Sequence, residues 1–321
     1  MKTRIFLALG LTLALATRTV AADYPDRPVK LIVPASPGGL NDTVARIIQP
    51  KLAEALKQPI VIENKSGANN TIGTDFVAKS APDGYTLVVV PGSHSVNPAV
   101  RRQMPFDTER DLTPIILIGK NPLMFLVNPS VHAKSMQEFA ALAKAQPNKF
   151  SFATPGVASQ AHLVLSQWAS VAGVSATQIP YRGGAPAMLA TIAGETQFTM
   201  MSTVLAAPQV AAGKLRGLAV GSLDRDPHFP DMPTLNESGY PGLEAVTWVG
   251  MFAPAGTPPA VVARLNAEIN QVIRDPDVAA NLDKQGLAIQ GGQPDLLGRL
   301  VAAEIARWVA VARQGNIRIE P

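Results

Sequence analysis

Short runs of apolar, β-branched residues alternate along the chain with longer segments whose apolar positions recur at helical spacing. The first unit predicts a strand over residues 29–33 and a helix over residues 42–56. The helix can be capped by Asn41 or Asp42, and it places its apolar residues on one face: Val44, Ile47, Ile48, Leu52 and Leu56. Strands that alternate with helices are typical of a parallel or mixed sheet covered by helices, so the sequence predicts an α/β fold.

Further strands are predicted at residues 60–63, 86–90, 150–153 and 177–180, and each is followed by a loop rich in Gly, Ser, Thr or Asn. Ligands of open α/β sheets bind beyond the carboxyl ends of the strands. The five loops that follow the predicted strands therefore form the candidate site. Three of these loops lie before residue 100, and two lie between residues 150 and 190.

The pattern also predicts two domains. An extended apolar stretch at residues 117–127 is expected to cross from one domain to the other, and a return crossing is expected between Gly221 and Trp248. Helices at residues 258–274, 276–285 and 294–312 would complete the first domain. We therefore expect residues 23–122 and 247–321 to form domain 1 and residues 123–246 to form domain 2, with a hinged ligand cleft between them.

Composition narrows the chemistry. The chain has 321 residues, 47% of them apolar, which is enough for the cores of two domains. It contains no cysteine, which excludes disulfides, zinc–thiolate sites, iron–sulfur clusters and a cysteine nucleophile. No HxxxH motif or acidic cluster has the spacing of metal ligands, so no metal or cofactor is expected.

Residues 1–22 have the pattern of a cleavable signal peptide. Lys2 and Arg4 precede an apolar run at residues 5–16, and small residues end the segment at Ala22. An uncleaved membrane anchor is the alternative, but the run is shorter than the ~20 apolar residues that a span needs. We expect export to the periplasm. Cleavage would lower the basic residues from 28 to 25 against 24 acidic ones, which argues against nucleic acid as a partner.

The loop of Ser36, Pro37, Gly38 and Gly39 lies directly before a predicted helix. It offers backbone amides and the positive end of a helix dipole, which together hold an anion without a cationic side chain. A Gly-Gly pair before a helix is more often a tight turn. However, loops at residues 66–73, 154–159 and 182–186 repeat the arrangement, which favours a ligand with more than one carboxylate. Neither GxxxxGK[ST] nor GxGxxG accompanies them, so a nucleotide site is not indicated.

The histidines raise the alternative of a serine hydrolase, because His94 lies between Ser93 and Ser95 and His162 follows Ser159 by three residues. The chain has no GxSxG nucleophile elbow, which weakens this hypothesis. A structural role for His162, hydrogen-bonded to a neighbouring loop at a helix start, is the simpler interpretation. His132 and His228 lie in polar turns and are expected to be exposed.

Each of several other candidate side chains could either line the ligand cleft or lie at the solvated rim or in the core. Lys65 and Arg182 lie in candidate loops, where each could pair with a ligand carboxylate or remain at the solvated rim. Tyr181 and Trp248 could form the cleft wall or belong to the core. Ser202 follows a strand that is expected to be buried, and it could face the cleft.

A series of motifs follows in order along nearly all of the chain after residue 23. They are Tyr24-Pro25, Ile32-Val33-Pro34 to Gly38-Gly39, Glu63-Asn64, Ala81-Pro82-Asp83-Gly84-Tyr85-Thr86-Leu87, Asn97-Pro98, Asp111-Leu112-Thr113-Pro114, Gly156 with Ser159 and His162, Pro180-Tyr181-Arg182-Gly183-Gly184-Ala185-Pro186, Gly213-Lys214-Leu215-Arg216 and Pro254-Ala255-Gly256-Thr257-Pro258-Pro259. In order and number these motifs resemble the substrate-binding receptors of tripartite tricarboxylate transporters, the Bug family of periplasmic solute receptors.

This resemblance implies the type II periplasmic-binding-protein fold, with two α/β domains joined by two crossing strands and a ligand cleft between them. It also implies small carboxylate ligands held by loop amides near the first glycine loop. By position it points to Ser36, Gly38, Gly39, Asn41 and Asp42 in domain 1 and to Ser159, His162, Tyr181, Gly183 and Ala185 in domain 2. The other loop residues of the candidate ligand-binding set are Pro37, Asn69, Asn70, Thr71, Ser93, His94, Arg182, Gly184 and Ser202.

Two departures from the family pattern bear on the ligand. Where relatives commonly read Pro-Gly-Ala-Gly-Gly, this chain has Asn69 and Asn70 in the last two positions. Their side-chain amides either extend the hydrogen-bonding reach of the loop or accompany left-handed backbone. A frequent Asp-Ser or Asp-Asn pair reads Met201-Ser202 here, so an acidic pocket group is expected to be missing.

We therefore expect a non-enzymatic receptor that closes around a small organic anion, a mono-, di- or tricarboxylate. The closed form would be recognised by the membrane permease subunits of a tripartite tricarboxylate transporter. An alternative is a sensing receptor whose closed form is read by a sensor kinase, and a serine hydrolase is a remote third hypothesis.

Overall fold

The computed structural model describes residues 24–181, 183–315 and 317. The expected signal segment and Arg182 lie outside these residues. Ten strands form one hydrogen-bonded sheet whose main order is β2-β1-β3-β9-β4-β7-β5-β6, with β10 and β8 also paired to β4. In this part of the chain no helix is both long and apolar enough to cross a bilayer. The α/β fold class is confirmed.

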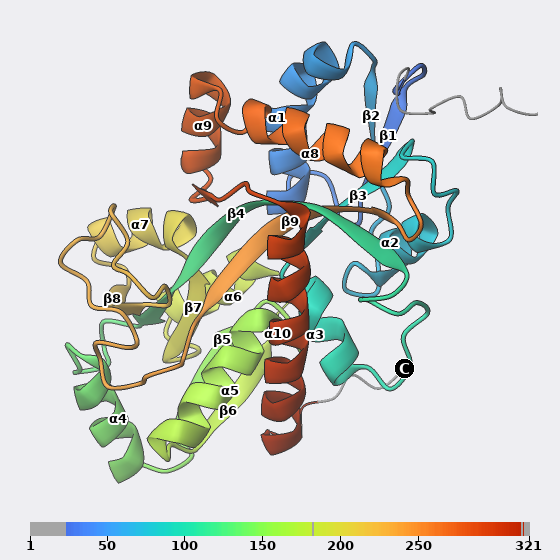
Figure 1. The fold of residues 1–321 in the computed structure, drawn as a ribbon. Helices are drawn as coiled ribbons and strands as arrows, with labels where there is room; N and C mark the ends of the chain where they lie inside the picture. The colour runs from blue at the N-terminus through green and yellow to red at the C-terminus, as the bar shows by residue number, and fades with distance from the viewer. Residues whose placement is uncertain (1–23, 182, 316, 318–321) are drawn as a thin grey trace, which may run out of the picture.

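The long strand β4 (Leu112–Val127) divides the sheet into two sections (Figure 1). Its residues 112–122 pair with β9, and its residues 123–127 pair with β7 and β8. We call the two sides of this division the first and second sections. The first section contains β1 (Val29–Val33), β2 (Ile60–Asn64), β3 (Thr86–Pro91), β9 (Val246–Pro254) and β10 (Ala288–Ile289). The second contains β5 (Phe150–Thr154), β6 (Ala176–Pro180), β7 (Phe198–Ser202) and β8 (Arg216–Val220).

Helices cover both faces of each section. The first section is flanked by α1 (Leu40–Leu56), α2 (Thr71–Ala78), α3 (Ser93–Val100), α8 (Pro259–Val272) and α9 (Pro276–Asp283). The second section is flanked by α4 (Met136–Ala145), α5 (Gln160–Ala172), α6 (Gly184–Ile192) and α7 (Thr203–Ala211). The last helix is α10 (Pro294–Gln314).

Alternation along the strands distributes apolar side chains between two buried layers in each section. In β1, Leu31 packs with α1 and α8, whereas Ile32 packs on the opposite face of the sheet. In β4, Phe125 joins the layer under α4 and α5, whereas Met124 joins the layer under α6 and α7. Strands that are buried on both faces have continuous apolar sequences. This explains why apolar and polar residues do not alternate in these segments.

Helix α10 packs against both sections of the sheet. Its first half places Leu297 and Val301 in a cluster with β1, β3 and β9. Its second half places Trp308 and Val311 in the core that contains α4 and α5. Figure 1 shows α10 running beside α3 from one section to the other. The helix therefore ties the two sections together.

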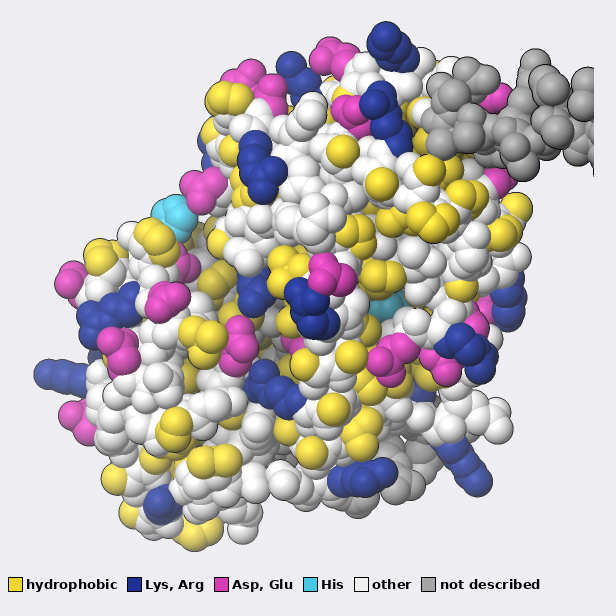
Figure 2. Space-filling model, viewed as in Figure 1, with side chains coloured by type: hydrophobic (Ala, Val, Ile, Leu, Met, Phe, Trp, Pro, Cys, Tyr) yellow, Lys and Arg dark blue, Asp and Glu magenta, His cyan; other side chains and the backbone are white. Residues whose placement is uncertain are grey.

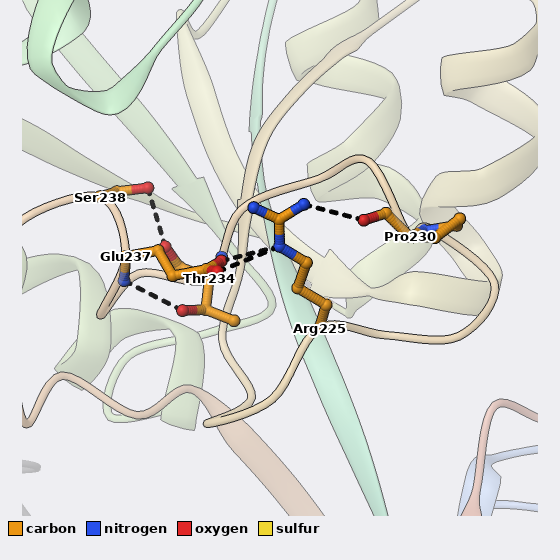
Figure 3. Close-up of polar contacts among 5 residues, drawn as sticks. All are labelled: Arg225, Pro230, Thr234, Glu237 and Ser238. Atoms are coloured by element: carbon orange, nitrogen blue, oxygen red, sulfur yellow. Dashed lines mark hydrogen bonds and ion pairs between the residues drawn. The ribbon is translucent and has the colours of Figure 1, made fainter.

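The connection between β8 and β9 is a long loop that folds on the second section. Glu237 accepts hydrogen bonds from Arg225 Nε and from the Thr234 amide, while Thr234 Oγ1 accepts one from the Glu237 amide (Figure 3). This reciprocal pair has the form of a capping box, which closes a turn without a long helix. Arg225 also donates to the Pro230 carbonyl and so fastens the middle of the loop.

Candidate functional site

The candidate loops of both sections face the point where the chain crosses between them. The three parallel strands of the first section end on the side where β4 leaves it, since β4 is antiparallel to β9 and β9 is antiparallel to β3. In the second section β7 is antiparallel to β4, and its last residue, Ser202, pairs with Leu123. Because β5 and β6 run parallel to β7, their carboxyl ends also point toward the crossing. The five predicted loops therefore converge.

The loop between β1 and α1 is built around a buried carboxylate. Asp42, 2% exposed, accepts a hydrogen bond from the Gly38 amide and one from Arg46 Nε on Oδ2, and one from Asn64 Nδ2 on Oδ1. The bonds from Arg46, Gly38 and Asn64 outweigh burial and lower the pKa of Asp42 to about 2. Asp42 therefore holds the loop, and its oxygens are already occupied by protein donors.

The first turn of α1 carries amides without protein acceptors. The N-cap is Gly39, which corrects the expectation that Asn41 or Asp42 would cap the turn. The first helical bond joins the Thr43 amide to the Gly39 carbonyl, so the amides of residues 40–42 find no acceptor among the described residues. Ser36, Pro37, Gly38 and Gly39 are exposed, whereas the Asn41 side chain is buried. The turn can bind an anion by its backbone.

In the loop between β2 and α2, the left-handed backbone considered for Asn69 and Asn70 is confirmed. Both residues have positive φ, 53° and 72°, a conformation that asparagine tolerates. Their side chains are also used: Asn69 Nδ2 donates to Asn97 Oδ1, Asn97 Nδ2 donates back to the Asn69 carbonyl, and Asn70 Nδ2 donates to Ser93 Oγ. The two asparagines therefore fasten the second loop to α3. The Thr71 hydroxyl donates to the Ala68 carbonyl within the loop.

The start of α3 separates Ser93 from His94. Ser93 is half-buried and accepts the bond from Asn70. His94 is 2% exposed and lies among aromatic rings, with ring centroids 5.0 Å from Phe252 and 6.2 Å from Phe106. Burial lowers the pKa of His94 to about 3, so the ring is neutral. This placement in the core removes His94 from the ligand-contacting side chains that we propose.

At the start of α5, the side chains of Ser159 and His162 accept hydrogen bonds from backbone amides. Ser159 is the N-cap and accepts the amide of His162, while His162 Nδ1 accepts the amide of Ala158 at 3.0 Å. Ala158 has a positive φ of 56°, so this bond helps to hold an unfavourable backbone. Burial lowers the pKa of His162 to about 4. The expected structural role of His162 is confirmed, and the two side chains do not form a nucleophile–base pair.

The loop between β6 and α6 is held mainly by its backbone. The Tyr181 amide donates to Thr154 and the Gly183 amide donates to Pro155, which joins this loop to the one before α5. The Tyr181 hydroxyl bonds to Glu195, beyond the far end of α6, so it turns away from the helix start. The amides of Gly184 and Ala185 have no acceptor among the described residues. Arg182 lies outside those residues.

Sequence reasoning missed Gln160, which bonds the start of α5 to the start of β9. Its Nε2 donates to the Val246 carbonyl at 2.6 Å, at the start of β9. A Cβ placed on Gly92 would lie 3.3 Å from Gln160 Oε1, so the residue before α3 touches the first residue of α5. Ser202 is half-buried at the N-cap of α7 on the same side. Trp248, 1% exposed, belongs to the core.

Lys65 and Arg101, which lie near the loops, already interact with other groups of the protein. Lys65 pairs with Glu63 at 2.6 Å and lies over the Phe76 ring, while Arg101 donates to the Ala68 carbonyl. Figure 2 shows acidic and basic residues interspersed on the face that it presents. Within the described residues, no group of three or more His, Asp and Glu is placed to hold a metal ion. The described loops therefore offer amides more than cations.

Two cavities lie elsewhere. One of about 480 Å³ is lined by Pro98, Ile305 and residues 104–111, and one of about 430 Å³ is lined chiefly by residues 228–233 with Lys134 and Gly217. No candidate loop residue lines either one among the described residues. The candidate site is thus defined by converging helix starts.

Comparison with known proteins places this geometry among transport receptors. Residues 44–317 match the family described as "Tripartite tricarboxylate transporter family receptor". The chain is similar to Protein BugT of Bordetella pertussis, at 35% identity over 99% of each chain.

Two solved structures that resemble this chain are described with a carboxylate. Rpa4515 of R. palustris, described with adipate, has a TM-score of 0.81 and 34% identity over 92% of this chain and 99% of its own. MatC of Rhodopseudomonas palustris, described with bound malate, has a TM-score of 0.77 and 34% identity over 90% and 99%. The overall fold of this chain is that of these binding proteins.

Proposed function

Because this chain belongs to the tripartite tricarboxylate transporter receptor family, which is a family of binding proteins rather than enzymes, we propose that it captures a small carboxylate in the periplasm. The carboxylate would then be delivered to the permease subunits of a transporter of that class. The pattern of residues 1–22 supports export.

The convergence of helix starts from both sections is the observation that carries this proposal. The first turn of α1 offers the amides of residues 40–42, and the starts of α5 and α6 offer those of Gln160, Ala161, Gly184 and Ala185. Each helix start adds the positive end of a dipole. A carboxylate that accepts several such amides binds through charge-assisted hydrogen bonds without a cation.

A ligand with two carboxylates suits this arrangement best. One carboxylate would accept the amides of α1, and the other would accept the amides of α5 and α6 across the gap between the sections. Adipate and malate, the ligands described for two relatives, are both dicarboxylates. Met201 stands where relatives often have an acidic residue, which reduces repulsion of a second carboxylate.

Capture requires that the two sections move relative to each other. We propose domains at residues 23–122 with 247–321 and at residues 123–246. The three chain segments at the boundary are bonded by Gly221 to Leu123, Leu123 to Ala245 and Ala245 to Gly221, each at 2.7–2.9 Å. A Cβ on Gly221 would lie 2.3 Å from the Ala245 carbonyl oxygen, so only glycine permits this approach. The chain crosses between the sections at Leu123 and at Ala245, and these two short crossings are the expected hinge.

Thermal unfolding of the protein, refolded to remove any ligand that copurifies, tests the proposal against adipate, malate, other carboxylates, amino acids and aromatic acids. A ligand present at ~1,000 times its dissociation constant adds ~4 kcal/mol to the free energy of unfolding. We expect a shift of several degrees for at least one dicarboxylate. Stabilisation only by ligands without a carboxylate would contradict the proposal.

A further inference from the structure

A buried carboxyl group lies in α10 at the junction of the two sections. Glu304 is 9% exposed and occupies the apolar stripe of its helix, between Val301 and Trp308. A glutamate at such a position is taken out of water when the helix packs. The candidate site described above makes no use of this group.

The carboxyl group has one hydrogen-bond donor of standard geometry and no ion pair within 4 Å among the described residues. Trp248 Nε1 donates to Glu304 Oε2 at 2.7 Å. Arg307, the cation one turn along α10, donates instead to Gln167 and to the Glu244 carbonyl. A carboxylate buried without a cation is unfavourable, and binding a proton relieves the cost.

The group is connected to the starts of α3 and α5 through Trp248. A Cβ on Gly92, the residue before α3, would lie 3.4 Å from Trp248 Nε1 and 3.3 Å from Gln160 Oε1. Ser95, in the first turn of α3, lies beside the carboxyl group without a hydrogen bond of standard geometry. Glu304 is therefore linked through Trp248 to the start of α3 and to the start of α5, which belongs to the candidate anion site.

Several buried polar atoms around this junction have no partner in the described part of the chain. They are His94 Nε2, Ser95 Oγ, Gln160 Oε1 and Arg307 Nε. Buried polar groups are normally bonded. These unpartnered atoms include donors as well as acceptors, so the hydrogen bonds around the carboxyl group can rearrange when Glu304 gains or loses a proton.

The charges facing Glu304 come from few groups. The positive charge of Arg307 on α10 favours the ionised carboxylate and lowers the pKa of Glu304, whereas the negative charge of Glu244, just before β9, raises it. His94 on α3 is neutral because burial lowers its pKa. Burial is the largest influence and raises the pKa of Glu304 to about 7, against the opposing bond from Trp248.

We propose that Glu304 is a proton-binding site of the receptor and that the proton and the carboxylate ligand bind together. The proposal rests on the proposed function, since it assigns a co-ligand to the same site. A ligand carboxylate at the start of α5 adds a negative charge near this junction, which makes the ionised form of Glu304 more unfavourable. By linkage, the bound anion then favours protonated Glu304, and protonated Glu304 favours the anion equally.

The proton site can be tested without a ligand. Intrinsic tryptophan fluorescence of the ligand-free protein, titrated between pH 5 and pH 9, should change with a midpoint near 7 because Trp248 bonds to Glu304. Glu304→Gln keeps an acceptor for Trp248 but cannot titrate, so its fluorescence should be flat. The same transition in Glu304→Gln, or none in the wild type, would overturn the proposal.

Coupling to the ligand is measured by calorimetry with adipate and malate at pH 6 and pH 8, in two buffers that differ in ionisation enthalpy. We expect the wild type to take up a fraction of a proton and to lose affinity several-fold at pH 8, up to tenfold per pH unit. Glu304→Gln should show neither effect. Glu268→Gln, which removes a carboxylate paired with Arg264 in α8, should behave as the wild type.

A second variant, Trp248→Phe, tests the proposal independently in case Glu304→Gln does not fold. Trp248→Phe removes the donor that lowers the pKa of Glu304, so the pH at which affinity falls should move upward. An unmoved midpoint would contradict the proposal. If none of the tested anions binds, the proposed function fails, while the ligand-free titration still decides whether Glu304 binds a proton.

Discussion

The candidate loops of the two sections are built by different means. In the first section, side chains fasten the loops to one another: Asp42 bonds to Gly38 and Asn64, and Asn69 bonds to Asn97. In the second section, the loops before α5 and α6 are joined by backbone bonds, with His162 and Ser159 acting only on their own turn.

This difference suggests different tasks. Loops cross-linked by buried side chains keep their amides in place without a ligand, which is the condition for tight binding at low entropic cost. Loops joined by backbone can move together as one body. We infer that the first section provides a preformed anion site and that the second section closes over it. The variants below test this contrast from the largest expected effect to the smallest.

The largest effect is expected for Asp42→Ala. The variant leaves the Gly38 amide and Asn64 Nδ2 without their buried acceptor, so the free energy of unfolding should fall by about 3 kcal/mol. Carboxylate affinity should fall more than tenfold because the loop before α1 loosens. Chemical denaturation and calorimetry measure the two losses.

Asp295→Ala is the matched control, because it removes a carboxylate from an exposed i,i+4 pair with Arg299; its effect should stay within about 0.5 kcal/mol. The pKa of Asp42 is lowered from 3.8 to about 2. Its contribution should therefore be complete above pH ~4 and be lost as the pH falls toward 2. Equal acid sensitivity in Asp42→Asn would argue against this role.

Asn97→Ala is expected to cost about 2 kcal/mol of unfolding free energy, since it removes both bonds to Asn69 and leaves the partly buried Asn69 carbonyl without this donor. Affinity should fall several-fold as the second loop separates from α3. Asn281→Ala, at an exposed position of α9, provides the control. A destabilised variant with unchanged affinity would remove the second loop from the site.

Gly39→Val should lower ligand affinity strongly while changing the free energy of unfolding little. Gly39 has negative φ, and an added Cβ would meet only the Ser36 carbonyl at 3.5 Å, an ordinary contact. Unfolding free energy should change by about 1 kcal/mol or less, the cost of a poor N-cap. The larger side chain should nevertheless cover the amides in the first turn of α1 and lower the binding affinity for every carboxylate at least tenfold. Unchanged affinity in titration calorimetry would place the ligand elsewhere.

Tyr181→Phe should have the smallest effect. The variant removes one partly exposed hydroxyl bond to Glu195 at 3.3 Å, so stability should change by less than about 0.5 kcal/mol. Because that hydroxyl points away from the start of α6, affinity should be unchanged. A clear loss of affinity would show that Tyr181 turns toward the ligand when the protein closes.

Much of the fold could be predicted from periodicity. The strand at residues 29–33 was predicted with its observed bounds, and α1 begins two residues before its predicted start. Such elements have local signals, namely apolar runs and helical stripes. The course of α10 could not be predicted, since the stripe that includes Leu297 and Trp308 does not say which core each half meets.

The candidate site was predicted at the level of loops more than of side chains. His94 lies between two serines, two residues after Gly92, which suggests an exposed loop, yet distant residues such as Phe106 and Phe252 enclose it. Asn97 and Gln160 carry no local signal of their long-range bonds. Glu304 did carry one, because it interrupts an apolar stripe between Val301 and Trp308.

The most direct test of the account is a crystal structure of the protein with adipate or malate. We expect one carboxylate to lie ~2.7–3.2 Å from amides in the first turn of α1, with the α5 and α6 starts approaching the other end. A carboxylate held by Lys or Arg side chains away from α1, or a ligand in the cavity lined by residues 104–111, would contradict the central claim that helix-start amides hold the anion.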